Sequence, residues 1–124
     1  MITEYIDKYK ELTASQPIKL GLYYMLVELC DGKSLPVGEL RSFKLKGREI
    51  LAVNFNDKIY CLDGLCTHAG ASLAEGRLQG DVLTCPLHYS QFIITDGSVL
   101  RGPADQSLRT YYVEEKENKV FIDL

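Results

Sequence analysis

The chain has 124 residues, of which 46% are apolar and 25% are charged, and its formal charge is −3. This is the composition of a globular domain, and it excludes a disordered or fibrous chain. The excess of acidic residues also argues against a nucleic-acid partner, because such partners are bound through clustered Lys and Arg.

The sequence contains no segment that is expected to cross a membrane, because a spanning helix needs about 20 consecutive apolar residues. The first dozen residues include Glu4, Asp7 and Lys8, which is unlike the apolar core of a signal peptide. We therefore expect a cytoplasmic protein that has no membrane partner.

Apolar residues at helical spacing predict an amphipathic helix over residues 1–16. Pro17 ends it, because a proline disfavours the helical conformation in the residue before it. We expect residues 1–22 to form an N-terminal helical extension to a domain of residues 23–124. The helix either docks on its own domain or contacts a partner or a second copy of the chain, and the sequence leaves both alternatives open.

Beyond the extension, β-favouring residues recur in short runs that turn signals separate. They predict strands at residues 23–28, 40–46, 49–55, 58–62, 81–84, 91–94, 98–100, 108–115 and 119–124. Asn56-Asp57 and Glu117-Asn118 are expected to form tight hairpin turns. Residues 63–79 show no regular pattern. The prediction is an all-β domain, an antiparallel sandwich or a small barrel.

Both histidines of the chain stand close to a cysteine, in Cys66-Thr67-His68 and in Cys85-Pro86-Leu87-His88. Sixteen residues, 69–84, separate the two groups. Such pairing of all the histidines with cysteines is improbable as a chance arrangement. Thiolate sulfur and imidazole nitrogen are ligands of zinc and of iron–sulfur clusters, so the pattern predicts a metal centre.

The two groups resemble the motif of the Rieske iron–sulfur family, and the resemblance covers roughly residues 23–124. It implies a Rieske-type β fold with a subdomain of cluster-binding loops and one [2Fe–2S] cluster per chain. Cys66 and Cys85 would bind one iron, and His68 and His88 the other. Two neutral imidazoles in place of two thiolates raise the reduction potential relative to an all-cysteine cluster.

Three further residues are implied by the resemblance to contact the cluster. Gly70 follows the first group of ligands, and Pro103 lies where Rieske domains have a third loop that covers the cluster. Ser90 lies two residues after His88, where a serine hydroxyl donates a hydrogen bond to a bridging sulfide and raises the reduction potential.

The chain also departs from the membrane-anchored respiratory Rieske proteins. Those proteins have a disulfide between their cluster loops, whereas this chain has Ala71 and Leu87 at the matching positions. A tyrosine that donates to the cluster in those proteins is Phe92 here. The chain looks instead like the soluble Rieske ferredoxins of ring-hydroxylating oxygenases. We expect a reduction potential in the lower half of the Rieske range of about −150 to +300 mV.

The resemblance implies an electron-transfer protein that is not itself an enzyme. A flavoprotein reductase would reduce it, and a terminal oxygenase or another redox enzyme would oxidise it. One alternative is a permanent small subunit of a redox enzyme such as a nitrite reductase, with the helix of residues 1–16 at the interface. Another is a structural zinc module, although zinc sites commonly have two cysteines first and two histidines later. Cys30 and Cys61 are expected to be free, buried cysteines.

Overall fold

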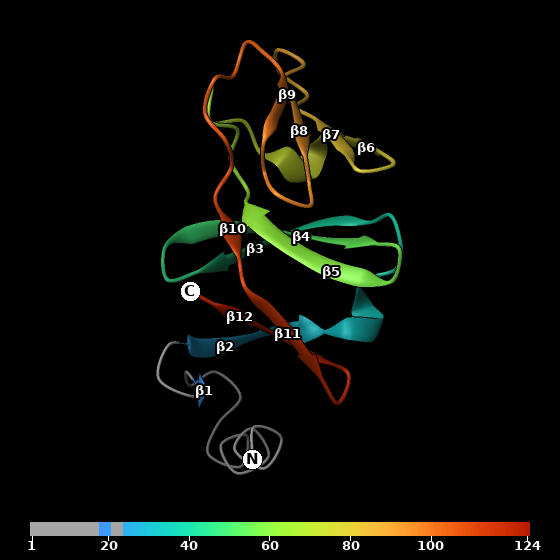
Figure 1. The fold of residues 1–124 in the computed structure, drawn as a ribbon, viewed down its shortest axis with the longest axis vertical. Coiled ribbons are helices and arrows are strands. Elements are labelled where there is room, and N and C mark those ends of the chain that lie inside the picture. Colours follow the sequence, from blue (N-terminus) through green and yellow to red (C-terminus); the bar gives the residue numbers. More distant parts are fainter. Residues whose placement is uncertain (1–17, 21–23) are drawn as a thin grey trace. The chain divides into compact units, whose positions relative to one another are not determined.

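The computed structural model describes residues 18–20 and 24–124 (Figure 1). These residues form twelve β-strands and two short 3₁₀ helices, and the strands make three antiparallel sheets. The all-β prediction is therefore confirmed for the described residues. The helix expected over residues 1–16 lies outside them, so the helix and an oligomer formed through it stay predictions. The chain divides into two compact units, residues 1–34 with 111–124 and residues 35–110.

The first unit contains one sheet of four strands in the order β1-β2-β12-β11. These strands are β1 (Ile18–Leu20), β2 (Tyr24–Asp31), β11 (Val113–Lys116) and β12 (Lys119–Asp123), and the helix η1 (Gly32–Ser34) follows β2. Phe121 and Ile122 of β12 are buried. Lys119 Nζ lies 3.2 Å from Glu28 Oε2 and 3.0 Å from Asp31 Oδ1, so ion pairs join β12 to β2.

The longest strands of the second unit form a hairpin-connected sheet. They are β3 (Leu40–Leu45), β4 (Arg48–Phe55) and β5 (Lys58–Asp63), and β10 (Thr110–Tyr111) completes the order β10-β5-β4-β3. Asn56 and Asp57 connect β4 to β5 with φ angles of 55° and 64°. Left-handed conformation at both turn residues matches the right-handed twist of the paired strands, and it confirms the predicted hairpin.

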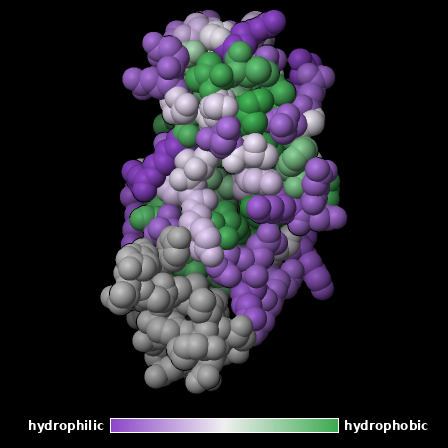
Figure 2. Space-filling model, in the orientation of Figure 1, coloured by the Kyte–Doolittle hydropathy of each residue, from purple (hydrophilic) through white to green (hydrophobic). Residues whose placement is uncertain are grey.

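The other sheet of the second unit is built from three-residue strands in the order β6-β7-β8-β9. These are β6 (Arg77–Gln79), β7 (Val82–Thr84), β8 (Gln91–Ile93) and β9 (Val99–Arg101), and the helix η2 (Leu73–Glu75) precedes them. Figure 2 shows hydrophobic residues reaching the surface in this part of the molecule. The buried hydrophobic residues of this part of the chain, which include Leu83, Phe92 and Ile94, pack in one core with Leu51 and Leu62. This core fixes the base of the loops that follow β5 and β7.

The predicted strands are present with small shifts at their ends. Two strands, β1 and β6, were not predicted: β1 lies within the segment expected to form the N-terminal extension, and β6 lies at the end of residues 63–79, which show no regular pattern. Residues 108–115 were predicted as one strand, but the chain breaks at Tyr112 into β10 and β11. No helix in residues 18–20 and 24–124 is long and apolar enough to span a membrane.

Candidate metal centre

The first Cys–His group lies in loop 1, residues 66–71, between β5 and η2. The Cys66 N–H donates a 2.8 Å hydrogen bond to the Ala71 carbonyl, and the Gly70 N–H donates one of 2.8 Å to the Cys66 carbonyl. Gly70 has a φ of 73°, a conformation that glycine adopts without steric cost. The loop thus closes on itself and holds the buried Cys66 below the exposed His68.

The second group lies in loop 2, residues 85–90, between β7 and β8. Its backbone repeats the pattern of loop 1. The Cys85 N–H donates a 2.8 Å hydrogen bond to the Ser90 carbonyl, and the Tyr89 N–H donates one of 3.2 Å to the Cys85 carbonyl. The residue in left-handed conformation is Tyr89, with a φ of 64°. Cys85 is buried and His88 is exposed, as their counterparts are in loop 1.

The four candidate ligands meet in two pairs. The thiols of Cys66 and Cys85 are close enough for Cys66 to affect the pKa of Cys85, and their residues are only 3% and 1% exposed. The rings of His68 and His88 contact each other edge to face, with 5.1 Å between their centroids. The structure therefore brings together all four residues that the sequence singled out.

Burial and neighbouring groups have opposing effects on the pKa of the Cys85 thiol. Burial is the largest and raises the pKa of Cys85, and the neighbouring thiol of Cys66 raises it further. Hydrogen bonds from the N–H groups of Leu87 and His88 lower this pKa without offsetting the rise. Because these N–H groups stabilise a negatively charged sulfur, the loop is prepared for a thiolate bound to a cation.

Loop 3, residues 102–108, is attached to both loop 1 and loop 2. The Ala104 N–H donates a 2.9 Å hydrogen bond to Ser90 Oγ, and Thr67 Oγ1 donates one of 2.7 Å to the Gln106 carbonyl. Ser90 is fully buried, whereas Pro103 is exposed in this loop. None of the four cysteines forms a disulfide. The two cluster loops are thus joined through loop 3 by hydrogen bonds.

Loop 3 contains the site residues that sequence reasoning missed. Ala104 and Gln106 act through a backbone N–H and a backbone carbonyl, which every sequence provides and which therefore give no signal. The partner of Gln106, Thr67 in loop 1, does have a signal in the sequence, because a hydroxyl beside a ligand is a common source of a loop hydrogen bond. Of the other two cysteines, Cys61 is buried as predicted, while Cys30 is only half-buried.

The donor set fits a [2Fe–2S] cluster of mixed ligation, which takes two thiolates on one iron and two imidazoles on the other. Within residues 18–20 and 24–124, no three His, Cys, Asp or Glu side chains gather as they would around a single metal ion. The thiols instead form a buried pair and the imidazoles an exposed pair. Buried thiols beneath exposed imidazoles give an electron a short route to the surface through the histidines.

Comparison with known proteins identifies the family. The model of the Rieske [2Fe-2S] domain matches residues 25–112. The ferredoxin component of the naphthalene 1,2-dioxygenase system of Pseudomonas aeruginosa is 34% identical over 90 residues, which are 73% of this chain and 86% of that protein. The biphenyl 2,3-dioxygenase ferredoxin component of Rhodococcus jostii is 32% identical over 99 residues, or 80% and 92% of the two chains.

Solved structures agree with these relatives. A chain from the complex of reduced oxygenase and oxidised ferredoxin in carbazole 1,9a-dioxygenase matches with a TM-score of 0.75 and 30% identity, covering 79% of this chain and 92% of its own. The carbazole 1,9a-dioxygenase ferredoxin of Nocardioides aromaticivorans has a TM-score of 0.75 and 26% identity, covering 79% and 96%. The chain therefore belongs to the Rieske [2Fe–2S] family and is an electron-carrying ferredoxin, with one cluster, homologous to those of dioxygenase systems.

Proposed function

We propose that Cys66 and Cys85 bind one iron of the cluster and that His68 and His88 bind the other. The proposal is supported by the matching backbones of the two loops and by the pairing of the four side chains. The bound cluster supplies reversible one-electron chemistry. The N–H groups of Leu87 and His88 hold negative charge on the Cys85 sulfur, and the histidine rings provide the surface through which an electron passes.

Gly70, Ser90 and Pro103 are proposed to line the cluster. Gly70 allows loop 1 to turn back at its φ of 73°, and Pro103 belongs to the loop that joins the other two. Ser90 Oγ accepts a hydrogen bond from the Ala104 N–H at 2.9 Å, and the hydroxyl proton is then left to donate elsewhere. A bridging sulfide is the acceptor that we propose for it. Such a bond is stronger to the reduced cluster, so it raises the reduction potential.

The proposed role of the chain is to carry single electrons from a flavoprotein reductase to the terminal oxygenase of a ring-hydroxylating dioxygenase system, in the cytoplasm. One observation carries this proposal: the candidate thiolate ligands are buried and the candidate imidazole ligands are exposed. A carrier must give up its electron to a large protein at its surface, and the histidines are the only candidate ligands placed to do so. Relatives that are 32–34% identical are named as the ferredoxin components of such systems.

Spectroscopy and electron transfer test the two parts of this proposal. Electron paramagnetic resonance of the dithionite-reduced protein should show the lowered average g-value of mixed nitrogen and sulfur ligation, with two irons and two sulfides per chain. The reduced protein is then mixed in a stopped-flow instrument with oxygenase components of the naphthalene, biphenyl and carbazole dioxygenase systems. Oxidation of the ferredoxin by at least one of them is expected. An all-cysteine signal would contradict the ligand assignment, and failure with every oxygenase would contradict the role.

A further inference from the structure

Tyr89 has an unusual backbone conformation. Six residues other than glycine have a positive φ among the described residues. Five of them occupy two-residue hairpin turns: Lys46, Asn56, Asp57, Glu117 and Asn118. Tyr89 is the sixth, with a φ of 64°, and it lies instead in loop 2 directly after His88. A bulky side chain in this conformation is strained, and such strain is concentrated at functional sites.

The Tyr89 side chain does not serve the fold. At 67% exposure it is the most exposed of the large hydrophobic residues that the structure describes. Its hydroxyl makes no hydrogen bond to residues 18–20 or 24–124. Loop 1 has the same backbone hydrogen bonds with a glycine at the equivalent position, Gly70. A side chain that is absent from one loop and outward-facing in the other is not needed to hold this backbone.

The surroundings of Tyr89 are suited to contact with another protein. Leu87, two residues earlier, is 52% exposed, so His88 stands between two exposed hydrophobic side chains. Loops 1 and 2 contain no charged residue. Tyrosine and leucine therefore form an apolar patch beside an exposed redox ligand, and tyrosine is enriched among residues that dominate binding energy at protein interfaces.

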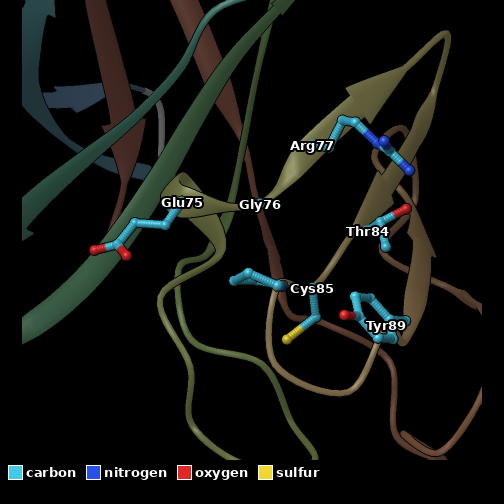
Figure 3. A pocket seen from close by; sticks show the side chains of 7 residues that line it. Glu75, Gly76, Arg77, Thr84, Cys85 and Tyr89 are labelled. Carbon is cyan, nitrogen blue, oxygen red and sulfur yellow. The ribbon is translucent and has the colours of Figure 1, made fainter.

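A hollow lies on one side of the Tyr89 ring (Figure 3). Its volume is about 270 Å³, and Arg77, Cys85 and Tyr89 are among the residues that line it. In Figure 3 the ring lies beside Cys85, and the Glu75 carboxylate points away from Cys85. The volume falls below the range of roughly 300–1,000 Å³ that pockets for small ligands have. It is suited to a single side chain of a docked protein.

We propose that Tyr89 is a specificity-determining contact of this ferredoxin for its terminal oxygenase. The ring packs against an apolar part of the oxygenase surface while the imidazoles face the acceptor, and the hollow takes one oxygenase side chain. The strained conformation is retained because it directs the ring outward beside His88. This inference rests on the proposed function, since it names the residue through which the proposed electron transfer selects its acceptor.

The experiment uses the full chain with its cluster and the oxygenase that oxidises the unsubstituted chain fastest. Three variants are compared. Tyr89→Gly removes the ring and relieves the strain, Tyr89→Phe keeps the ring, and Lys46→Gly relieves the left-handed conformation of a distant hairpin turn with a φ of 51°. Stopped-flow mixing gives the second-order rate constants for reduction by the reductase and for oxidation by the oxygenase. Voltammetry and thermal melting give the reduction potential and the stability.

For Tyr89→Gly, the rate constant for oxidation by the oxygenase should fall about tenfold. A loss of this size is expected when one contributing side chain is removed from a protein interface. The potential of this variant should be unchanged and its melting temperature unchanged or raised. Tyr89→Phe and Lys46→Gly should keep the full rate. An unchanged rate for Tyr89→Gly overturns the proposal, as does a loss confined to the reductase. A lower melting temperature or an altered potential shows that the ring supports the loop, and this too overturns it. If the unsubstituted chain reduces no oxygenase, the proposed function itself has failed.

Discussion

In loop 1 the residue four positions after the cysteine is Gly70, and in loop 2 it is Tyr89, with φ angles of 73° and 64°. Both loops close through the same two backbone hydrogen bonds. The histidines nevertheless stand at different distances from their cysteines, two residues in loop 1 and three in loop 2. The backbone around each cysteine is therefore repeated between the loops, whereas the side chains that it presents differ.

The two loops also differ in how they bind loop 3. Loop 1 donates a hydrogen bond from the exposed Thr67 to the Gln106 carbonyl, whereas loop 2 accepts one at the buried Ser90 from the Ala104 N–H. A buried hydrogen bond is more costly to lose than an exposed one, because water cannot replace the missing partner. The attachment of loop 2 should therefore be the more important of the two.

The largest expected effect tests whether the two cysteines are equivalent. Replacing Cys66 by Ser or Cys85 by Ser should abolish the cluster completely, because each removes one of the two thiolates proposed for the same iron. Iron and sulfide content and the visible spectrum measure this. Cys30→Ser, at a cysteine that forms no disulfide and lies outside the loops, is the control and should keep the cluster. Retention of a full cluster by either loop variant would contradict the equivalence.

A smaller effect should separate the attachments of the two loops. Ser90→Ala leaves the buried Ala104 N–H without a partner, at a cost of about 1–3 kcal/mol in the free energy of unfolding, whereas Thr67→Val should cost about 0.5–1 kcal/mol. Equilibrium unfolding in denaturant measures both costs. If the Ser90 hydroxyl stabilises the reduced cluster by about 1.4 kcal/mol more than the oxidised cluster, Ser90→Ala lowers the reduction potential by about 59 mV. Equal effects of the two variants would break the comparison.

The next prediction concerns the left-handed position of loop 1. Gly70→Ala should lower the free energy of unfolding by about 1–2 kcal/mol, because an L-residue is disfavoured there. A β-carbon at Gly70 would have no atom within 4 Å, so the cost comes from the backbone alone. Thermal melting measures it. Gly38→Ala, with a φ of 86° and equal free space, is the matched control, which should lose stability without altering the cluster spectrum.

The smallest expected effect lies at the far end of β8 from loop 2. The Ser98 hydroxyl and N–H both donate to the Asp96 carboxylate, at 2.7 and 2.9 Å, and the hydroxyl is the main cause of the lowered pKa of Asp96. A carboxyl with a lowered pKa stabilises the fold above its unfolded pKa, and this stability is lost as pH falls through the folded pKa.

Ser98→Ala should therefore reduce the melting temperature slightly at neutral pH, and the difference from the unsubstituted chain should vanish in acid. The reduction potential should not change, since the turn lies outside both loops. A shifted reduction potential in Ser98→Ala would contradict this expectation and would show that the turn after β8 affects the conformation of loop 2. Melting curves across the acid range and voltammetry at neutral pH are the measurements.

Much of the fold could be predicted because its turns have strong local signals. Asn-Asp between two β-favouring runs is sufficient to place the hairpin at Asn56 and Asp57, and the same holds for Glu117-Asn118. The strands β1 and β6 were missed because the segments around them, residues 1–22 and 63–79, give no alternating pattern to which a short strand could be assigned. The break at Tyr112 was missed because its neighbours all favour strands.

The candidate ligands could be predicted because the chain has only two histidines and each stands within three residues of a cysteine. The arrangement around them could not, since it depends on backbone atoms. Nothing in a sequence distinguishes the N–H of Ala104 or the carbonyl of Gln106 from any other. The conformation of Tyr89 was equally hidden, because tyrosine has no preference for the left-handed region.

Loop 3 has a consequence for how the protein is assembled. Its attachments to Thr67 and Ser90 are hydrogen bonds, and none of the four cysteines forms a disulfide, so closure of the site involves no sulfur–sulfur bond. Thiol reductants that would cut a covalent bridge leave such attachments intact. Strongly reducing solution should accordingly leave the three loops attached, because no pair of cysteines has to be oxidised to close the site.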